Sequence, residues 1–173
     1  MGNASRGRRP APPPATSAAA VAYTENGWTF LLWPDFAARW TALLRVVLQQ
    51  RSASPAGVPL ALSEATMLAA LVRLIRDHIA RDPNAAAFRL SGSLGAWRRV
   101  KFLGRFRLFY RFSSAHKIVV LTWLNDENTL RKTGAVTDPY YVFSSMLSRG
   151  EVPADWAALV VGATPLPTPL PHP

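Results

Sequence analysis

The stretch RRVKFLGRFRLFYRF (98–112) alternates basic with apolar side chains, and it decides the fold class. A period of two is the pattern of a β-strand that has one apolar and one polar face. Gly104 divides the stretch, which predicts two strands joined by a tight hairpin. The run KIVVLTWL (117–124) predicts a third, more deeply buried strand. We therefore expect an antiparallel meander at the centre of the chain.

N-terminal to this centre, the sequence predicts one more strand and two helices. GWTFLLWP (27–34) is short, aromatic and β-prone, and it ends in a proline. Apolar residues then recur at helical spacing, which predicts a helix over about 36–50 behind the capping residue Asp35. After a loop over 51–59, a second helix is expected to open at Ser63 and to line the core as far as His78 and Ile79.

A third helix is expected in the C-terminal part. Asp138-Pro139 has the composition of a helix start, and Arg149-Gly150 that of a helix end. The order strand, two helices, three strands, helix predicts an α+β fold, in which helices pack on one face of a small antiparallel sheet.

The folded body is expected to span 22–161. Residues 1–21 are rich in Pro, Ala and Arg and predict a disordered tail, and residues 162–173 predict an extended Pro-rich tail. An export signal is not favoured, because prolines follow the Arg8-Arg9 pair where such a signal needs an apolar core.

Composition excludes several classes of protein. A length of 173 residues with 49% hydrophobic residues fits one packed domain, and arginines interrupt the apolar runs that could otherwise span a membrane. The absence of cysteine excludes a disulfide framework, a thiol nucleophile and a thiolate metal site, and it favours a cytoplasmic protein. His78, His116 and His172 are too scattered for a zinc site, so no metal or other cofactor is expected.

Positive charge is concentrated in the predicted meander. The chain has a net charge of +10, and no acidic residue lies between Pro83 and Asn125. Five cations alternate onto one side of the predicted hairpin: Arg99, Lys101, Arg105, Arg107 and Arg111. Because charges are costly to bury, this basic face is expected to meet water, an acidic partner or a phosphate backbone. A solvated face usually mixes both signs, so the absence of acids favours a polyanion.

Three blocks of sequence carry a resemblance to a known family. SLGAWRRVKFLGRFRLFYRF, KIVVLTWLNDENTLRKTG and TDPYYVFSSMLSRGEVPADW occur in the order and spacing of the YhaV-type toxins of bacterial type II toxin–antitoxin systems, within the RelE superfamily of ribonucleases. The resemblance is strong over about 89–160 and looser back to Asn26. It implies a RelE-like fold and a toxin that cleaves messenger RNA at the ribosome. In this chemistry the ribose 2′-hydroxyl attacks the neighbouring phosphate, without a metal ion.

The resemblance also implies site residues. Those matched in place are all basic: Arg99, Lys101 and Arg107. The family's further arginine would fall near Asn128 and its catalytic tyrosine near Gly134, and neither residue type is present there. We expect Arg131 to take the first role, and Tyr140 or its neighbour Tyr141 the second. Lys101 is expected to serve in proton transfer or to polarise the 2′-hydroxyl.

Contacts with RNA are expected from four further residues: Arg98, Arg105, Arg111 and Asn128. Structural roles compete with functional ones. A tyrosine on a capped helix is more often a core residue, the polar run Asn125 to Asn128 more often caps a turn, and Trp97 and Trp123 are expected to pack in the core.

Two other functions remain open at this point. A non-catalytic nucleic-acid-binding module, or a structural protein that binds an acidic partner, would use the same basic face. A two-histidine ribonuclease is disfavoured, because only His116 lies near the basic strands and it occupies a turn. The toxin interpretation implies a cognate AbrB-like antitoxin, messenger RNA and the ribosome as partners, operator DNA through the antitoxin complex, and no membrane.

Overall fold

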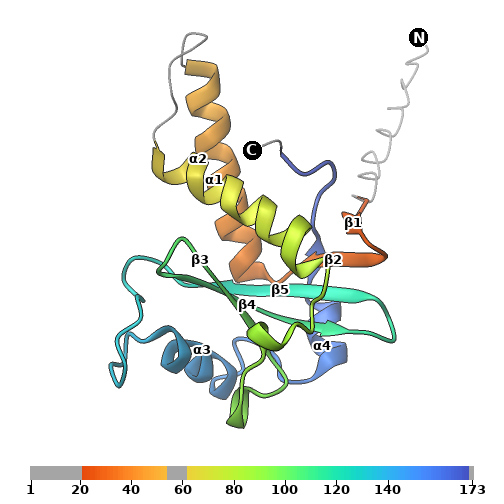
Figure 1. Cartoon of the computed structure of the whole chain (residues 1–173), viewed down its shortest axis with the longest axis vertical. Helices are drawn as coiled ribbons and strands as arrows, with labels where there is room; N and C mark the ends of the chain where they lie inside the picture. The colour runs from red at the N-terminus through yellow and green to blue at the C-terminus, as the bar shows by residue number, and fades with distance from the viewer. Residues whose placement is uncertain (1–20, 54–61, 172–173) are drawn as a thin grey trace, which may run out of the picture.

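The computed structural model describes residues 21–53 and 62–171, in which helices pack against a central sheet (Figure 1). The tail expected over 1–21 lies, apart from Val21, outside the described residues. The same holds for His172 and for most of the loop expected at 51–59. Within the described ranges, no helix is long and apolar enough to cross a membrane.

The sheet of the described residues has six strands: β1 (Thr24–Glu25), β2 (Trp28–Leu32), β3 (Arg98–Phe102), β4 (Phe106–Ser113), β5 (Ile118–Leu124) and β6 (Thr164–Pro165). Their order is β1-β2-β5-β4-β3, and β6 pairs with β2. The predicted meander of β3, β4 and β5 is confirmed, since both of its pairs are antiparallel. The α+β class is confirmed as well. The sheet is mixed rather than wholly antiparallel, because β2 and β5 pair in parallel.

The parallel pair follows from the path of the chain. After β2, the chain passes through α1 (Pro34–Ala53) and α2 (Leu62–Arg73) and enters the sheet again at its far edge as β3. Parallel neighbours need a long crossover of this kind. Two hairpin reversals then bring β5 beside β2, pointing in the same direction.

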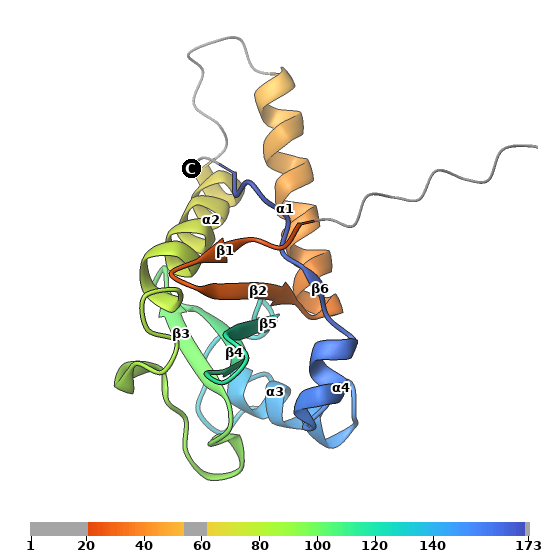
Figure 2. The same ribbon diagram turned by 90° about the vertical axis from the view of Figure 1, so that its right-hand side faces the viewer.

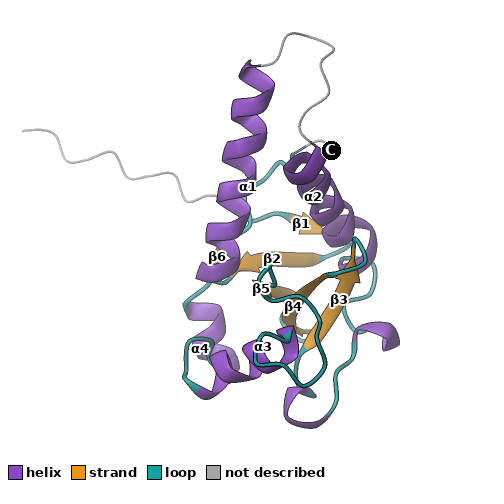
Figure 3. Ribbon diagram, turned by 90° about the vertical axis from the view of Figure 1, so that its left-hand side faces the viewer, coloured by secondary structure: helices purple, strands orange, loops and turns teal. Residues whose placement is uncertain are grey.

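Helices cover both faces of the sheet, which corrects the expectation that they pack on one face. α1 and α2 lie on one side, and α3 (Pro139–Ser148) and α4 (Trp156–Val161) on the other (Figures 2 and 3). Side chains of β4 alternate between two apolar cores: Leu108 and Tyr110 belong to the core of α1 and α2, and Phe109 packs with Phe143 of α3. The basic side chains of the hairpin that share a face with Phe109 therefore lie toward α3.

The first two helices differ in detail from the pattern. α1 begins at Pro34, a residue whose fixed φ suits the first turn of a helix. Leu48, expected in the apolar stripe, is 62% exposed. α2 continues into a π-helical turn, η1 (Leu74–Ile79), whose wider spacing buries Leu74, Ile75 and Ile79. His78 is exposed on this turn and does not line the core as expected.

The sequence pattern did not predict several short elements. They are β1, β6, the six-residue helix α4, and the 3₁₀ turns η2 (Ala86–Phe88) and η3 (Gly92–Leu94). The segment expected as a tail from residue 162 onward packs on the body as far as it is described. β6 pairs with Leu31 and Leu32, and Leu166 is fully buried. Proline suits such an edge position, because an edge strand leaves one row of backbone groups unpaired.

Candidate active site

Three guanidinium groups surround the ring of Tyr140 on the α3 side of the sheet. The Cζ atoms of Arg99, Arg107 and Arg131 lie 5.8, 6.0 and 5.0 Å from the ring centroid. Arg99 comes from β3, Arg107 from β4 and Arg131 from the loop after β5, while Tyr140 stands in the first turn of α3. We call these four residues the Tyr140 cluster. All four were expected at the site from sequence.

Local structure explains why the four residues meet. Alternation along β3 and β4 turns Arg99 and Arg107 to the face of Phe109. Asp138 caps α3, accepting a hydrogen bond from the backbone N–H of Tyr140 at 3.0 Å. The Tyr140 ring then contacts Phe109 edge-on, with 5.7 Å between the ring centroids. The phenol is thus fixed by an apolar contact from the middle of the sheet and by the start of a helix.

The Tyr140 cluster has buried donors that the protein does not satisfy. Arg107 is only 6% exposed, and its Nη1 donates to the carbonyl of Arg105 at 2.9 Å. The Nε atoms of Arg99 and Arg107 are buried without a hydrogen-bond partner among the described residues. A buried unpaired donor costs about 1–3 kcal/mol, more when charged. These two donors therefore favour an acceptor that comes from outside the chain.

The charge of the cluster points the same way. Of its three guanidinium groups, only that of Arg131 has an ion pair among the described residues, with the carboxylate of Asp138. Lys101 adds a further cation at the edge, since it stands opposite Arg107 in the register of β3 and β4 and is exposed. Directly opposed residues of an antiparallel pair have Cβ atoms roughly 5 Å apart. The site is thus a positively charged surface with unused donors, suited to an anion such as phosphate.

Arg98 lies on the other face of β3. Its guanidinium donates to Asn84 Oδ1 at 2.9 Å and to the carbonyls of Gly95 and Trp97, and it stacks over Phe112. These contacts attach the segment before β3 to the sheet. The structure therefore does not bring Arg98, an expected RNA contact, to the Tyr140 cluster.

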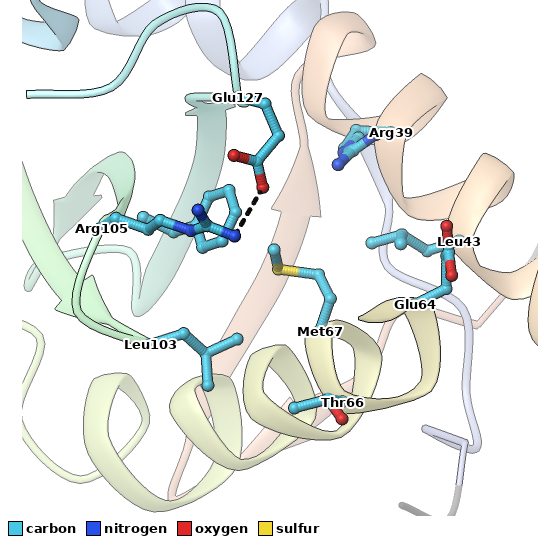
Figure 4. Close-up of a pocket in the computed structure, with 9 residues that line it drawn as sticks. Arg39, Leu43, Glu64, Thr66, Met67, Leu103, Arg105 and Glu127 are labelled. Carbon is cyan, nitrogen blue, oxygen red and sulfur yellow. Dashed lines mark ion pairs between the residues drawn. The ribbon is translucent and has the colours of Figure 1, made fainter. Parts of the chain in front are cut away.

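Arg105 is also separated from the cluster, which corrects the expectation of five cations on one face. It lies in the hairpin turn after Leu103 and Gly104, and forms an exposed ion pair with Glu127 at 3.0 Å. This pair lines a pocket of about 440 Å³ between the hairpin, α1 and α2 (Figure 4). The core of α1 and α2 lies on the other face of the sheet from the core of α3. The turn, with positive φ at both central residues, rotates Arg105 out of the strand alternation.

Arg111 shares the α3 and α4 side of the sheet but is held by the protein. Its guanidinium lies between the rings of Trp97 and Trp156, at 5.7 and 5.8 Å, and donates to the carbonyl of Ala154. Asn128 is exposed in the loop after β5, and its backbone N–H donates to Asp126 Oδ1. Neither residue is a member of the Tyr140 cluster.

Asn125 is a supporting residue whose role the sequence left open. Its Oδ1 accepts the backbone N–H of Arg107 at 2.5 Å, and its Nδ2 donates to the carbonyls of Thr129 and Arg105 at 3.0 and 3.3 Å. The buried amide thus ties the loop after β5 to the start of β4. A single Asn after a strand is a common turn signal, so the sequence could place it in a turn but not at Arg107.

The remaining candidates lie elsewhere. Tyr141 is exposed on α3, and Trp97 is buried, as expected for a core residue. His116 stands at the far end of β4 from Arg107, with its Nδ1 2.9 Å from Ser113 Oγ. Burial raises the pKa of Tyr110 well above its ordinary value, so this phenol stays protonated. In the described part of the chain, no three His, Cys, Asp or Glu side chains gather as metal ligands would.

Comparison with known proteins agrees with the resemblance seen in the sequence. Residues 30–164 match the Toxin_YhaV family model, described as a toxin with endonuclease activity, of a toxin–antitoxin system. The chain is 44% identical over 141 residues to the ribonuclease toxin YhaV of Escherichia coli K12, covering 78% of this chain and 90% of that protein. The toxins YhaV of Escherichia coli O157:H7 and O6:H1 match with the same identity and coverage. No solved structure matches the chain significantly.

Proposed function

Since this chain belongs to the YhaV family of endonuclease toxins from toxin–antitoxin systems, we propose that the Tyr140 cluster binds the scissile phosphate of messenger RNA and cleaves it without a metal ion. The observation that supports this proposal is the pair of buried, unpartnered Nε donors of Arg99 and Arg107 beside a third guanidinium. Phosphate oxygens are acceptors that match arginine forks in geometry and charge.

The proposed reaction is a transesterification within the RNA. The 2′-oxygen of the ribose forms a bond with the adjacent phosphorus while the bond to the 5′-oxygen of the next nucleotide breaks. One proton leaves the 2′-hydroxyl and one is delivered to the departing 5′-oxygen. The products are a 2′,3′-cyclic phosphate and a 5′-hydroxyl end, so no water is consumed.

The charge that develops on the phosphate oxygens gives the three arginines their role. Donors aimed at developing charge usually supply the largest part of an enzyme's rate enhancement. Arg107, the most buried of the three, is the central phosphate ligand in this proposal. Arg99 and Arg131 flank it around the same ring.

Proton transfer is assigned to Tyr140 and Lys101. Tyr140 is half-buried, and its ring lies among the three guanidinium groups, beside the phosphate that they are proposed to bind. Lys101 is exposed beside Arg107 across the hairpin and can approach the ribose from the rim. Arg105 and Asn128, both exposed, are proposed contacts for flanking nucleotides, because an exposed ion pair such as Arg105 with Glu127 is weak and can exchange for a phosphate.

The biological setting is part of the same proposal. A toxin–antitoxin system implies an antitoxin, and the net charge of +10 favours an acidic segment in it. We propose an AbrB-like antitoxin, operator DNA bound through the toxin–antitoxin complex, and cleavage of messenger RNA on cytoplasmic ribosomes. Parallel assays with and without ribosomes test the last point.

A defined RNA and a matched substrate with one 2′-deoxy nucleotide at the cleavage position test the chemistry. We expect cleavage of the RNA in the presence of EDTA, a cyclic phosphate on the upstream product by mass spectrometry, and no cleavage at the deoxy position. Arg107→Ala should lower the single-turnover rate by at least about 100-fold. Cleavage of the deoxy substrate at the normal rate, or loss of activity in EDTA with rescue by a divalent cation, would overturn the proposal.

A further inference from the structure

The carboxylate of Asp138 makes more bonds than a helix cap requires. Its Oδ1 accepts the backbone N–H of Tyr140 at 3.0 Å, and its Oδ2 accepts the backbone N–H of Lys132 at 3.2 Å. The same Oδ2 forms the ion pair with Nη1 of Arg131. Asp138 is only 3% exposed. One buried group thus joins the start of α3 to the loop that carries Arg131.

Asp155 shows what capping alone looks like in this chain. It caps α4 by accepting the backbone N–H of Ala158 at 2.8 Å, and it is exposed to solvent. Burying a carboxylate is costly unless hydrogen-bond partners replace the lost water, so a carboxylate that only caps a helix is expected to stay exposed. The burial of Asp138 is matched by its two bonds to the preceding loop, which capping does not explain.

We propose that Asp138 is a positioning residue, which holds the guanidinium of Arg131 against the Tyr140 ring in the place where it meets the scissile phosphate. This inference rests on the proposed function. Arg131 Cζ lies 5.0 Å from the ring centroid, and the carboxylate that binds Arg131 also binds the backbone of Tyr140. The arginine and the phenol therefore keep their relative position through one rigid group.

The pair leaves Arg131 able to bind a substrate. The Arg131 side chain is 40% exposed, whereas that of Asp138 is 5% exposed, so the open side of the pair belongs to the arginine. Arg131 uses Nη1 for Asp138, and its other donors have no hydrogen-bond partner within the described residues. A guanidinium has five N–H donors, which leaves enough for a phosphate.

The pair also opposes repulsion within the site. Arg99 and Arg107 lie around the same ring as Arg131, and like charges at this separation repel. Without the carboxylate, the long side chain of Arg131 would turn toward solvent. A small misplacement of a charge in an active site can cost on the order of 100-fold in rate.

The test uses the full chain, made in a cell-free system, and measures kcat and KM for RNA cleavage. Asp138→Asn keeps an oxygen for the cap and removes the charge, and Asp155→Asn is the matched control at a cap without an arginine. Each variant is also made in an Arg131→Ala background. Thermal melting reports the fold, and Asp138→Ser supplies a second neutral cap if Asp138→Asn does not fold.

We expect Asp138→Asn to lower kcat at least about tenfold with little change in KM, and to have no further effect once Arg131 is alanine. Asp155→Asn should cleave at the wild-type rate. A wild-type kcat in Asp138→Asn, or an undiminished effect in the Arg131→Ala background, would overturn the inference and leave the proposed function intact. A wild-type protein that cleaves no RNA in this assay would overturn both.

Discussion

Replacing Arg107 with methionine is expected to stabilise the fold and abolish cleavage. Arg107 is 6% exposed, shares the Tyr140 ring with two other guanidinium groups, and has an unpartnered Nε. Replacing a buried ion pair by apolar residues of similar volume is often neutral, or stabilising by about 1–4 kcal/mol, and Arg107 has no ion pair among the described residues to compensate its burial. Methionine has an unbranched chain that adapts to irregular gaps, so it can follow the path of the arginine stem.

The hydrogen bond that Arg107→Met removes contributes little to stability. Arg107 Nη1 donates to the carbonyl of Arg105, a bond whose net contribution is about 1 kcal/mol. That carbonyl keeps a second partner in the variant, because Asn125 Nδ2 also reaches it at 3.3 Å. The expected balance is a rise of up to about 3 kcal/mol in the free energy of unfolding. For a domain of this size the melting temperature should rise by roughly 2–4 °C for each kcal/mol gained.

Urea unfolding followed by tryptophan fluorescence measures the free energy, and single-turnover cleavage measures the chemistry. Arg73→Met is the matched control, since Arg73 is exposed at the end of α2, and such a surface change should stay within about 0.5 kcal/mol of wild type. The reasoning is refuted if Arg107→Met loses more than about 1 kcal/mol, which would make Arg107 a satisfied structural residue. It is refuted equally if the variant cleaves RNA at the wild-type rate.

Three other variants separate chemistry from packing. Tyr140→Phe should slow cleavage at least about 100-fold without changing the melting temperature. Tyr110→Phe removes the hydrogen bond to the Pro83 carbonyl at 2.8 Å, so it should lose about 1 kcal/mol of stability and cleave normally. The reverse pattern would contradict the assignment of Tyr140 to the active site. Arg111→Ala should lower the free energy of unfolding in urea by about 2–4 kcal/mol, because it removes two tryptophan contacts and a charged hydrogen bond. Unchanged stability together with a shallower salt dependence of RNA binding would instead show that Arg111 contacts phosphate. Lys101→Arg keeps the charge but cannot lose a proton, so its rate should fall; a wild-type rate with an unshifted pH profile would limit Lys101 to an electrostatic role.

The local patterns predicted local structure well. The alternation in 98–112 gave the hairpin, and it correctly turned Arg99 and Arg107 to the same face. The same alternation predicts that Arg98 and Val100 lie on one face of β3, and the structure agrees. The expectation that Arg98 contacts RNA followed from its charge alone.

Long-range pairing could not be predicted in the same way. Nothing in the residues of β2 indicates that β5 is its parallel neighbour, because that pairing depends on where the crossover returns the chain to the sheet. α4 has six residues, too few for a helical period to stand out. Because the sequence does not predict α4, it does not predict the contact of Arg111 with the Trp156 ring. Arg111 is therefore interpreted from the sequence as an exposed basic residue.

The site was predictable in its residue types and less so in its connections. The resemblance to the family leaves an arginine and a tyrosine unmatched, and Arg131 and either Tyr140 or Tyr141 are the expected substitutes. The structure brings Arg131 and Tyr140 to Arg99 and Arg107. The contact of Asp138 with Arg131 could not be predicted, because the sequence pattern of a capping aspartate is the same whether its side chain is buried or exposed. Its burial is a property of the packed loop, visible only once Arg131 and Lys132 have folded back onto it.

The position of β6 beside β2 has a consequence for the synthesis of the protein. β2 is made directly after its neighbour β1, but two further neighbours follow at a distance in the chain: β5 comes much later, and β6 later still. The Tyr140 cluster is spread over the same interval, since Arg99 and Tyr140 come from different parts of the nascent chain. Strand pairing between distant parts of a chain is also slow to form, because the entropy of loop closure is lost before any contact is gained. The Tyr140 cluster therefore cannot assemble before α3 has been synthesised, and a nascent chain that stalls before α3 carries the arginines without the tyrosine around which they gather.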